Sequence, residues 1–364
     1  MVSSRLATLL ARHNIYYGWV VVAVTFLTML VTAGAMGAPG VLIVPLEHEF
    51  GWANAQISTA LAIRLLLFGL FGPFAAAFMN RFGLRRVMIS AAALIVTGLI
   101  ASLAMTQVWQ LVLLWGFVVG IGSGLTAIVL AATVATRWFT QRRGLVVGLL
   151  SASSATGQLV FLPLIAELTE HFGWRVALVF VCALLVLAAL TAFALMRDRP
   201  SDVNLPPYGE TAVTPPPPAG VGLLSLLSSP LTVLADAARV PLFWVLFATF
   251  FICGLSTNGL IQTHFITLCA DYGLAAVTAA SVLAMMGVFD FVGTIGSGWL
   301  SDRFDNRWLL FWYYGLRGLS LLFLPFTDFS FYGLSLFAVF YGLDWIATVP
   351  PTVKLTADRF GREN

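Results

Sequence analysis

The sequence predicts an all-α polytopic membrane protein made of two related helical bundles, the second of which is incomplete. Three observations lead to this fold class. Hydrophobic residues make up 60% of the chain and charged residues 10%, whereas soluble domains carry about 25% charged residues. Long apolar runs recur along the whole chain. A short basic pattern also occurs twice, at one fixed offset.

Ten apolar runs are long enough to cross a bilayer, whose hydrocarbon core of about 30 Å needs about 20 residues per helix. The first run follows Arg5, Arg12 and His13, as in a signal peptide, but it is too long for one and is interpreted as an uncleaved span. In order, the predicted spans are residues 18–45, 56–79, 87–105, 108–136, 144–166, 174–196, 241–268, 274–300, 308–326 and 330–351.

Positive charge marks one side of the predicted membrane protein. All but three of the 19 Lys and Arg residues lie at the N-terminus, in alternate loops or in the tail. Of the three exceptions, Arg175 lies in a loop on the other side, and Arg64 and Arg317 lie within spans. By the positive-inside rule, we expect a multi-pass protein of the cell membrane with both termini in the cytoplasm.

One long connection, residues 197–240, separates two groups of spans. It holds half of the 16 prolines, including Pro215 to Pro218, and several charges. Such a composition does not span lipid, and we do not expect it to pack a core. The predicted organisation is a six-helix bundle at 1–196, a cytoplasmic proline-rich linker at 197–240 and a four-helix bundle at 241–364.

The basic pattern follows the second span and recurs after the eighth. Residues 80–87 read NRFGLRRV and residues 301–308 read SDRFDNRW, and an offset of 222 positions relates them. The aligned pairs are Asn80 with Asp302, Arg81 with Arg303, and Arg85 with Arg307. Parallel repeats of a six-helix unit build one large class of secondary transporters. The same offset puts the counterparts of spans five and six beyond Asn364, so we interpret the chain as truncated after its tenth span.

These loops resemble the signature of the major facilitator superfamily, and the resemblance covers essentially the whole chain. The family pattern after span two is Gly-x-x-x-Asp-Arg-x-Gly-Arg-Arg. Here Arg81, Gly83, Arg85 and Arg86 fit, while Ala76 and Asn80 replace the first Gly and the Asp. The second copy keeps Gly298, Asp302 and Arg303 but has Asp305 at the later Gly. The resemblance implies a fold of two pseudo-symmetric bundles, here with ten of twelve helices, and a gating role for the loop residues.

Three further stretches are similar to the monocarboxylate and oxalate–formate antiporter branch. They are Tyr16–Trp19, Gly173–Arg175, and the segment from Pro350 to Arg362. This resemblance implies a small anionic solute. One departure concerns span eight, where the branch has an arginine four residues after its aspartate. Asp290 fits that aspartate, but Thr294 stands at the arginine position.

Four ionisable residues lie inside predicted spans, where a central charge costs about 2.5–3.5 kcal/mol on insertion scales. They are Arg64, Asp290, Arg317 and Asp344. The last three lie at a similar depth, so we expect Arg317 to pair with one aspartate, and with Asp344 first because a short loop joins their spans. The pair either locks two helices together or belongs to a network that senses protons or substrate. Two acids and one base leave one acid without a cation, which suits proton coupling.

Two further positions have open interpretations. Arg64 either faces a central cavity, where it would attract an anionic substrate, or extends to the outer interface. Asn258 and Gln262 share a helix face in span seven, and they either line a cavity or bond a neighbouring helix.

The sequence leaves three classes of function. The first is a secondary transporter that moves a small organic, anionic solute by alternating access. The second is a truncated, non-transporting remnant or a regulatory membrane protein. A membrane enzyme is the weakest, because no catalytic constellation, metal spacing or nucleotide motif is evident. We predict a small solute, protons and the lipid bilayer as partners, with no cofactor, metal or nucleic acid, and a monomeric state.

Overall fold

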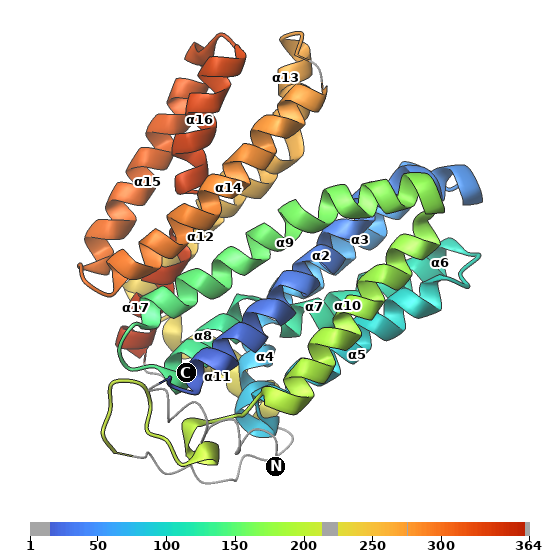
Figure 1. Cartoon of the computed structure of the whole chain (residues 1–364). Coiled ribbons are helices and arrows are strands. Elements are labelled where there is room, and N and C mark those ends of the chain that lie inside the picture. Colours follow the sequence, from blue (N-terminus) through green and yellow to red (C-terminus); the bar gives the residue numbers. More distant parts are fainter. Residues whose placement is uncertain (1–14, 213–224, 275, 361–364) are drawn as a thin grey trace. The chain divides into compact units, whose positions relative to one another are not determined.

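The computed structural model describes residues 15–212, 225–274 and 276–360, and these are almost wholly helical (Figure 1). The all-α fold predicted from the composition is therefore confirmed. The chain divides into two compact units. Unit 1 comprises Met1–Gln141 and Gly157–Pro230, and unit 2 comprises Arg142–Thr156 and Leu231–Asn364. The predicted bundle boundaries at 196 and 241 stay a prediction.

Seven helices within the described residues are long and apolar enough to cross a membrane, and an eighth span results if the bent pair α3–α4 is counted as one. The chain is a multi-pass membrane protein. The count of ten spans stays a prediction.

Unit 1 contains the helices of the first half of the chain. They are α2 (Gly18–Phe50), α3 (Asn54–Leu70), α4 (Gly72–Phe82), α5 (Leu84–Ser102), α6 (Val108–Leu111), the π-helical η1 (Val112–Val119), α7 (Gly120–Leu125), α8 (Ile128–Trp138), α9 (Arg143–Phe172) from Gly157 onward, α10 (Trp174–Leu195) and the short 3₁₀ turn η2 (Pro200–Val203). In the core, α10 packs against α5 and α2, while α3 packs against η1 and α7. Leu42, Ile57, Ile95 and Trp115 are fully buried there.

The predicted span 56–79 is bent, because the chain turns by 54° between α3 and α4. The bend lies at Phe71, which separates the two helices. Pro73 explains it in part, because proline has no N–H to donate to the carbonyl one turn earlier and its ring clashes with that carbonyl.

The first part of the linker belongs to unit 1 and is hydrogen-bonded to other parts of that unit. The hydroxyl of Tyr16 donates to the carbonyl of Pro206 at 2.9 Å. The backbone N–H of Tyr208 donates to Trp138 at 2.8 Å, and that of Thr140 donates to Tyr208 at 2.9 Å. Residues 206–208 are therefore held beside the ends of α2 and α8 by bonds that composition does not reveal.

Unit 2 contains the first part of α9, up to Thr156, and the helices of the second half of the chain. They are α11 (Ser225–Ala237), whose first residues belong to unit 1, then α12 (Pro241–Gly254), the π-helical η3 (Leu255–Gln262), α13 (Thr263–Asp271), α14 (Ala276–Ser301), α15 (Asn306–Phe323), the 3₁₀ turn η4 (Leu324–Thr327), α16 (Phe331–Leu343) and α17 (Val349–Phe360). Helix α14 packs against α16, and α15 packs against α16 and α17.

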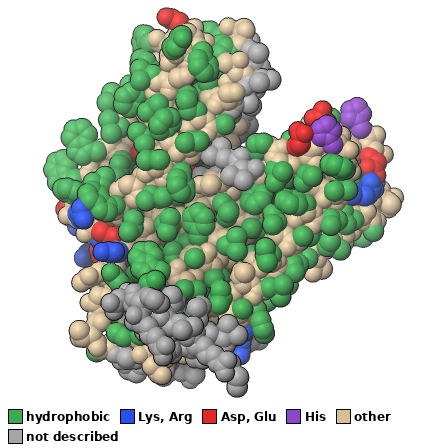
Figure 2. All heavy atoms as spheres, in the orientation of Figure 1, with side chains coloured by type: hydrophobic (Ala, Val, Ile, Leu, Met, Phe, Trp, Pro, Cys, Tyr) green, Lys and Arg blue, Asp and Glu red, His purple; other side chains and the backbone are tan. Residues whose placement is uncertain are grey.

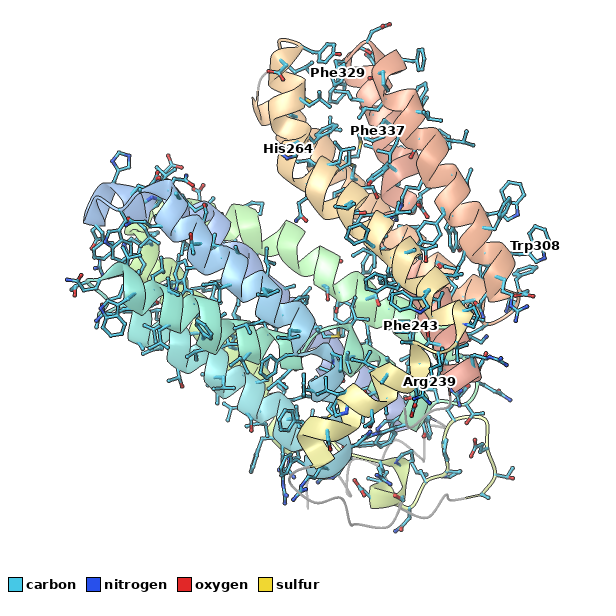
Figure 3. The ribbon with its side chains drawn as sticks, turned by 180° about the vertical axis from the view of Figure 1, so that it is seen from behind. Arg239, Phe243, His264, Trp308, Phe329 and Phe337 are labelled. Carbon is cyan, nitrogen blue, oxygen red and sulfur yellow. The ribbon has the colours of Figure 1, made fainter. Side chains whose placement is uncertain are left out.

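Aromatic side chains build the core of unit 2 (Figure 3). Phe337 of α16 is fully buried and stacks on Phe265 of α13, with ring centroids 6.2 Å apart. Phe329 stacks on Tyr272 at 3.8 Å. Trp308, at the start of α15, points outward and is exposed.

Large apolar side chains also cover much of the outer surface (Figure 2). On α15 the exposed residues Trp308, Phe311, Leu319 and Leu322 follow one another at helical spacing. In water such a stripe would be a liability. On a membrane protein it is the surface that lipid tails contact.

Candidate functional site: a charge network at a broken helix

The last predicted span is not one helix. Helix α16 ends at Leu343 and α17 begins at Val349, so the helix is interrupted within the predicted span 330–351. Pro350 and Pro351 follow the break, and neither has a backbone N–H to donate to the carbonyls of Ile346 and Ala347. The Pro-Pro pair was the sequence signal for this break. Its consequence is a stretch of unwound backbone, which must find partners elsewhere inside the membrane.

Arg317 of α15 supplies two of those partners. Its Nη2 donates to the backbone carbonyls of Asp344 and of Trp345, the latter at 2.8 Å. Its Nε donates to the Asp344 carboxylate oxygen Oδ2 at 2.8 Å. Arg317 is 2% exposed and Asp344 is 4% exposed. The ion pair predicted from the shared depth of these residues is therefore present, and one guanidinium binds both a carboxylate and two main-chain oxygens.

The remaining guanidinium nitrogen reaches the first membrane helix of unit 2. Nη1 of Arg317 donates to Thr257 Oγ1 at 3.3 Å and contacts Cys253 Sγ at 2.7 Å. Sequence reasoning missed both residues. A cysteine and a threonine four positions apart give no signal by themselves, since small polar side chains are common between packed membrane helices.

Asp290 of α14 satisfies the other side of the break. Its Oδ1 accepts hydrogen bonds from the backbone N–H of Ile346 at 2.9 Å and from Thr294 Oγ1 at 2.8 Å. The side chain of Ser297, two turns along α14, donates to the carbonyl of Ala347. Asp290 is fully buried, and its Oδ2 has no hydrogen-bond partner among the residues that the structure describes. Asp290 is thus the acid without a paired cation.

The network has two parts with different chemical properties, an ion pair and a carboxyl group without a paired cation. Arg317 and Asp344 form a dry ion pair, and removing either partner would strand a buried charge. Asp290 holds only neutral donors on one oxygen and leaves the other oxygen available. A carboxyl group in such a setting can bind and release a proton without breaking the neighbouring pair.

Arg64 of α3 is buried inside unit 1. It is 5% exposed, and its Nη2 donates to the carbonyl of Met36 in α2 at 2.8 Å. Nε and Nη1 have no hydrogen-bond partner among the described residues. Of the two interpretations, extension to the outer interface does not fit this burial. Arg64 is therefore a buried guanidinium with two nitrogens left without a partner among the described residues.

Of the polar pair predicted on span seven, the structure describes the side chain of Gln262 alone. Gln262 is the last residue of the π-helical segment η3 and is exposed. The side chain of Asn258 lies outside the described residues.

The first copy of the basic pattern lies between α4 and α5. Asn80 Oδ1 accepts a hydrogen bond from Arg137 Nη2 at 2.6 Å. The guanidinium of Arg81 lies over the ring of Phe82 at 5.5 Å. Gly83 has φ +88°, a left-handed conformation that suits glycine, and it begins the turn into α5.

Asp198, which follows α10, packs against that first turn. Its Oδ1 accepts the backbone N–H of Arg85 at 2.8 Å. It thereby satisfies one of the N–H groups that a helix start leaves without an internal partner.

The second copy contains an acid bound at a helix start. Asp302 Oδ1 accepts the N–H of Gly144 at 2.8 Å, and its Oδ2 accepts that of Leu145 at 2.9 Å. Lys354 Nζ lies 3.5 Å from the same carboxylate. A pseudo-twofold relation between the two repeats predicts Asp302 near the start of span five, and these two bonds place it there. The positive end of α9 and its two N–H donors attract this carboxylate.

The other members of the second copy have local roles. Arg303 lies over the ring of Trp299 at 3.7 Å. The N–H of Arg307 donates to Asp305 Oδ1 at 2.9 Å, so Asp305 caps α15. Asp305 and Gly83 both stand just before a helix in their copies. Asp305 starts α15 with a side-chain cap, whereas Gly83 starts α5 through its backbone conformation.

Glycines let α9 approach α14 closely beside Asp302. A Cβ on Gly148 would lie 2.6 Å from the carbonyl oxygen of Thr294, and one on Gly144 would clash with the carbonyl of Gly298. No side chain larger than hydrogen fits at either position without movement of the backbone.

Comparison with known proteins decides the family. The model of the major facilitator superfamily matches residues 24–364. The chain belongs to this superfamily. It is a membrane transporter rather than an enzyme.

Two curated relatives cover almost the whole chain. Monocarboxylate transporter 12-B of Danio rerio is 26% identical over 380 residues, which are 95% of this chain and 75% of the relative. Monocarboxylate transporter 13 of Rattus norvegicus is 27% identical over 356 residues, which are 95% of this chain and 76% of that protein. These matches agree with the resemblance to the monocarboxylate branch.

A solved structure supports the fold. The proton:xylose symporter XylE has a TM-score of 0.66 and 16% sequence identity, and the match covers 93% of this chain and 81% of that one. At this identity the likeness concerns the fold alone.

Proposed function

We propose that this superfamily member is a secondary active transporter that moves a small organic anion, of the monocarboxylate type, by alternating access. The observation that carries the proposal is the buried network of Arg317, Asp344 and Asp290 around the break between α16 and α17. Secondary transporters bind substrates and coupling ions where membrane helices are discontinuous, because unwound backbone offers polar groups there.

Asp290 is the group we propose to carry the coupling proton. Its carboxyl group is fully buried and has one oxygen without a partner among the described residues. The neighbouring cation, Arg317, is already bound to Asp344. Protonation of Asp290 would weaken its hold on the N–H of Ile346, and this would link proton binding to the conformation of the broken helix.

Arg64 is the group we propose to attract the substrate's carboxylate. The relatives are named monocarboxylate transporters, and Thr294 stands where the resembled branch has its arginine. Arg64 offers donors without partners inside the other bundle. Guanidinium–carboxylate bonds are among the strongest that proteins use for such recognition.

Asp302 is the proposed latch of the cytoplasmic gate. Its carboxylate holds the first turn of α9, and its release would accompany opening toward the cytoplasm. In this proposal the bundle at 1–196 and the bundle at 241–364 move against each other during transport. Both termini are cytoplasmic, and the monomer transports on its own.

Uptake into proteoliposomes tests the proposal. With an inward proton gradient, the wild-type chain is expected to accumulate one or more members of a panel of small radiolabelled carboxylates. Asp290→Asn should lose gradient-driven uptake but retain exchange of labelled for unlabelled substrate. Arg64→Gln should raise the KM by about 10-fold or more, because a hydrogen bond to a charged group contributes about 1.5–3 kcal/mol.

A matched control is Arg175→Gln, because Arg175 pairs with Glu49 away from both proposed sites. It should leave the KM unchanged. Gradient-driven uptake that persists in Asp290→Asn would exclude Asp290 as the coupling group. Uptake of neutral solutes alone would exclude the anionic substrate.

A further inference from the structure

An apolar groove of about 340 Å³ opens on the surface of unit 1 between α5 and α10. Ile89, Ala93 and Thr97 line it from α5, and Ala189 and Phe193 line it from α10. Small side chains, Ala92 and Ala93 of α5 and Ala189 of α10, leave this space between the two helices. From Ile89 to Thr97 the groove follows α5 for about 12 Å, at 1.5 Å per residue. That length suits a segment of an acyl chain.

The groove lies on the face of unit 1 that contacts lipid. Phe193 is 60% exposed, and Leu190 and Val186 on the same helix are exposed as well. Figure 2 shows hydrophobic side chains over the surface formed by α5 and α10. A groove on this face is therefore open to lipid tails along its length.

Two arginines stand at the end of the groove where α5 begins. The guanidinium carbon of Arg85 lies 4.5 Å from the ring centroid of Phe193, the aromatic side chain that lines that end. Arg86 is exposed, and both lie about one turn before Ile89. The nearby carboxylate is Asp198, which is bound to the backbone N–H of Arg85. The groove thus leads from an apolar trough to a positively charged end.

We propose that this groove binds an anionic phospholipid from the leaflet in which α5 begins, the cytoplasmic one by the charge pattern. One acyl chain occupies the trough between α5 and α10, and the headgroup phosphate binds Arg85 and Arg86. Contact with Phe193 accounts for the position of Arg85, but it explains neither the exposed Arg86 nor the trough. Basic groups at helix ends near an anionic surface attract lipid headgroups, and an anionic lipid fits both parts of the site.

Native mass spectrometry of the full chain, released from nanodiscs of equal phosphatidylglycerol and phosphatidylcholine, tests the proposal. The wild type should retain phosphatidylglycerol in preference to phosphatidylcholine. Arg85→Gln with Arg86→Gln should reduce that preference by about 10-fold or more, since each basic residue near an anionic surface contributes about fivefold. Ala189→Leu, which fills the trough, should reduce retention of both lipids.

Two controls match these changes. Arg239→Gln removes an exposed arginine from unit 2, and Ala183→Leu enlarges an exposed alanine of α10 outside the groove. Both should retain phosphatidylglycerol as the wild type does. An unchanged preference in the Arg85 and Arg86 variant would overturn the headgroup site. Equal effects of Ala189→Leu and Ala183→Leu would overturn the acyl-chain site. Inorganic phosphate that displaces the bound lipid would show that the arginines bind a free anion instead.

Discussion

Replacing Arg317 should destabilise this protein far more than replacing Asp344, although the two form one ion pair. Arg317→Leu strands the buried Asp344 carboxylate and also removes the donor to the carbonyls of Asp344 and Trp345. Breaking a buried pair costs about 3–5 kcal/mol, and each unsatisfied carbonyl costs about 1–3 kcal/mol. The total, about 5–11 kcal/mol, is comparable to the net stability of a typical domain.

Asp344→Asn leaves more of the network intact. Arg317 keeps its bonds to both carbonyls and to Thr257. The loss of stability then comes only from the loss of the charged partner of Arg317, about 3 kcal/mol. The double change, Arg317→Leu with Asp344→Leu, removes the stranded charge but not the two unsatisfied carbonyls. Its cost of about 2–6 kcal/mol should therefore stay below that of Arg317→Leu, yet the double variant should not regain the stability of the wild type.

The assay measures the melting temperature of detergent-solubilised protein. Samples are heated, and size-exclusion chromatography then quantifies the protein that remains folded. At about 2 °C per kcal/mol, Asp344→Asn should melt about 6 °C below the wild type. Arg317→Leu should melt at least about 10 °C below it or fail to accumulate. Arg239→Leu is the control, because its ion pair with Asp236 is exposed. A double variant as stable as the wild type would refute the role given to the carbonyl bonds.

Three further predictions concern other contacts. Gly148→Ala puts a Cβ 2.6 Å from a backbone oxygen of α14, so we expect a loss of about 1–3 kcal/mol, measured by the same melting assay. Gly254→Ala, where nothing lies within 4 Å of the added Cβ, should be nearly neutral. Asp302→Asn weakens the hydrogen bonds to the first turn of α9. A cysteine placed in the cytoplasmic part of the pathway should therefore be alkylated faster. An unchanged alkylation rate would exclude the latch. Hydrogen bonds from Arg175 and then Trp174 lower the pKa of Glu49 below its ordinary 4.5. The stabilisation is therefore present above that value and lost as pH falls through the lowered pKa, so the difference in melting temperature between the wild type and Glu49→Gln should vanish in strong acid.

Several features followed from the sequence because lipid imposes strict rules. Apolar runs of span length and few charges leave only a helical membrane protein. A buried charge is costly in that environment, so Arg317 was expected to pair with an acid at its own depth, and with Asp344 first because a short loop joins their two spans. The repeat offset placed Asp302 at the start of α9, because equivalent positions of two similar bundles meet equivalent neighbours.

Only the tertiary structure decided where freed polar groups find partners. The Pro-Pro pair marks a break near Asp344, but it does not say that Arg317 and Asp290 fill it, since both come from other helices. Arg64 had two interpretations in the sequence, and its burial beside Met36 does not fit an extension to the outer interface. The composition of the linker named no partners for its residues, and in the structure Tyr16 donates a hydrogen bond to Pro206 and Trp138 accepts one from Tyr208. Composition and spacing report what a segment must bury, whereas the partners of each donor and acceptor depend on which helices become neighbours in space.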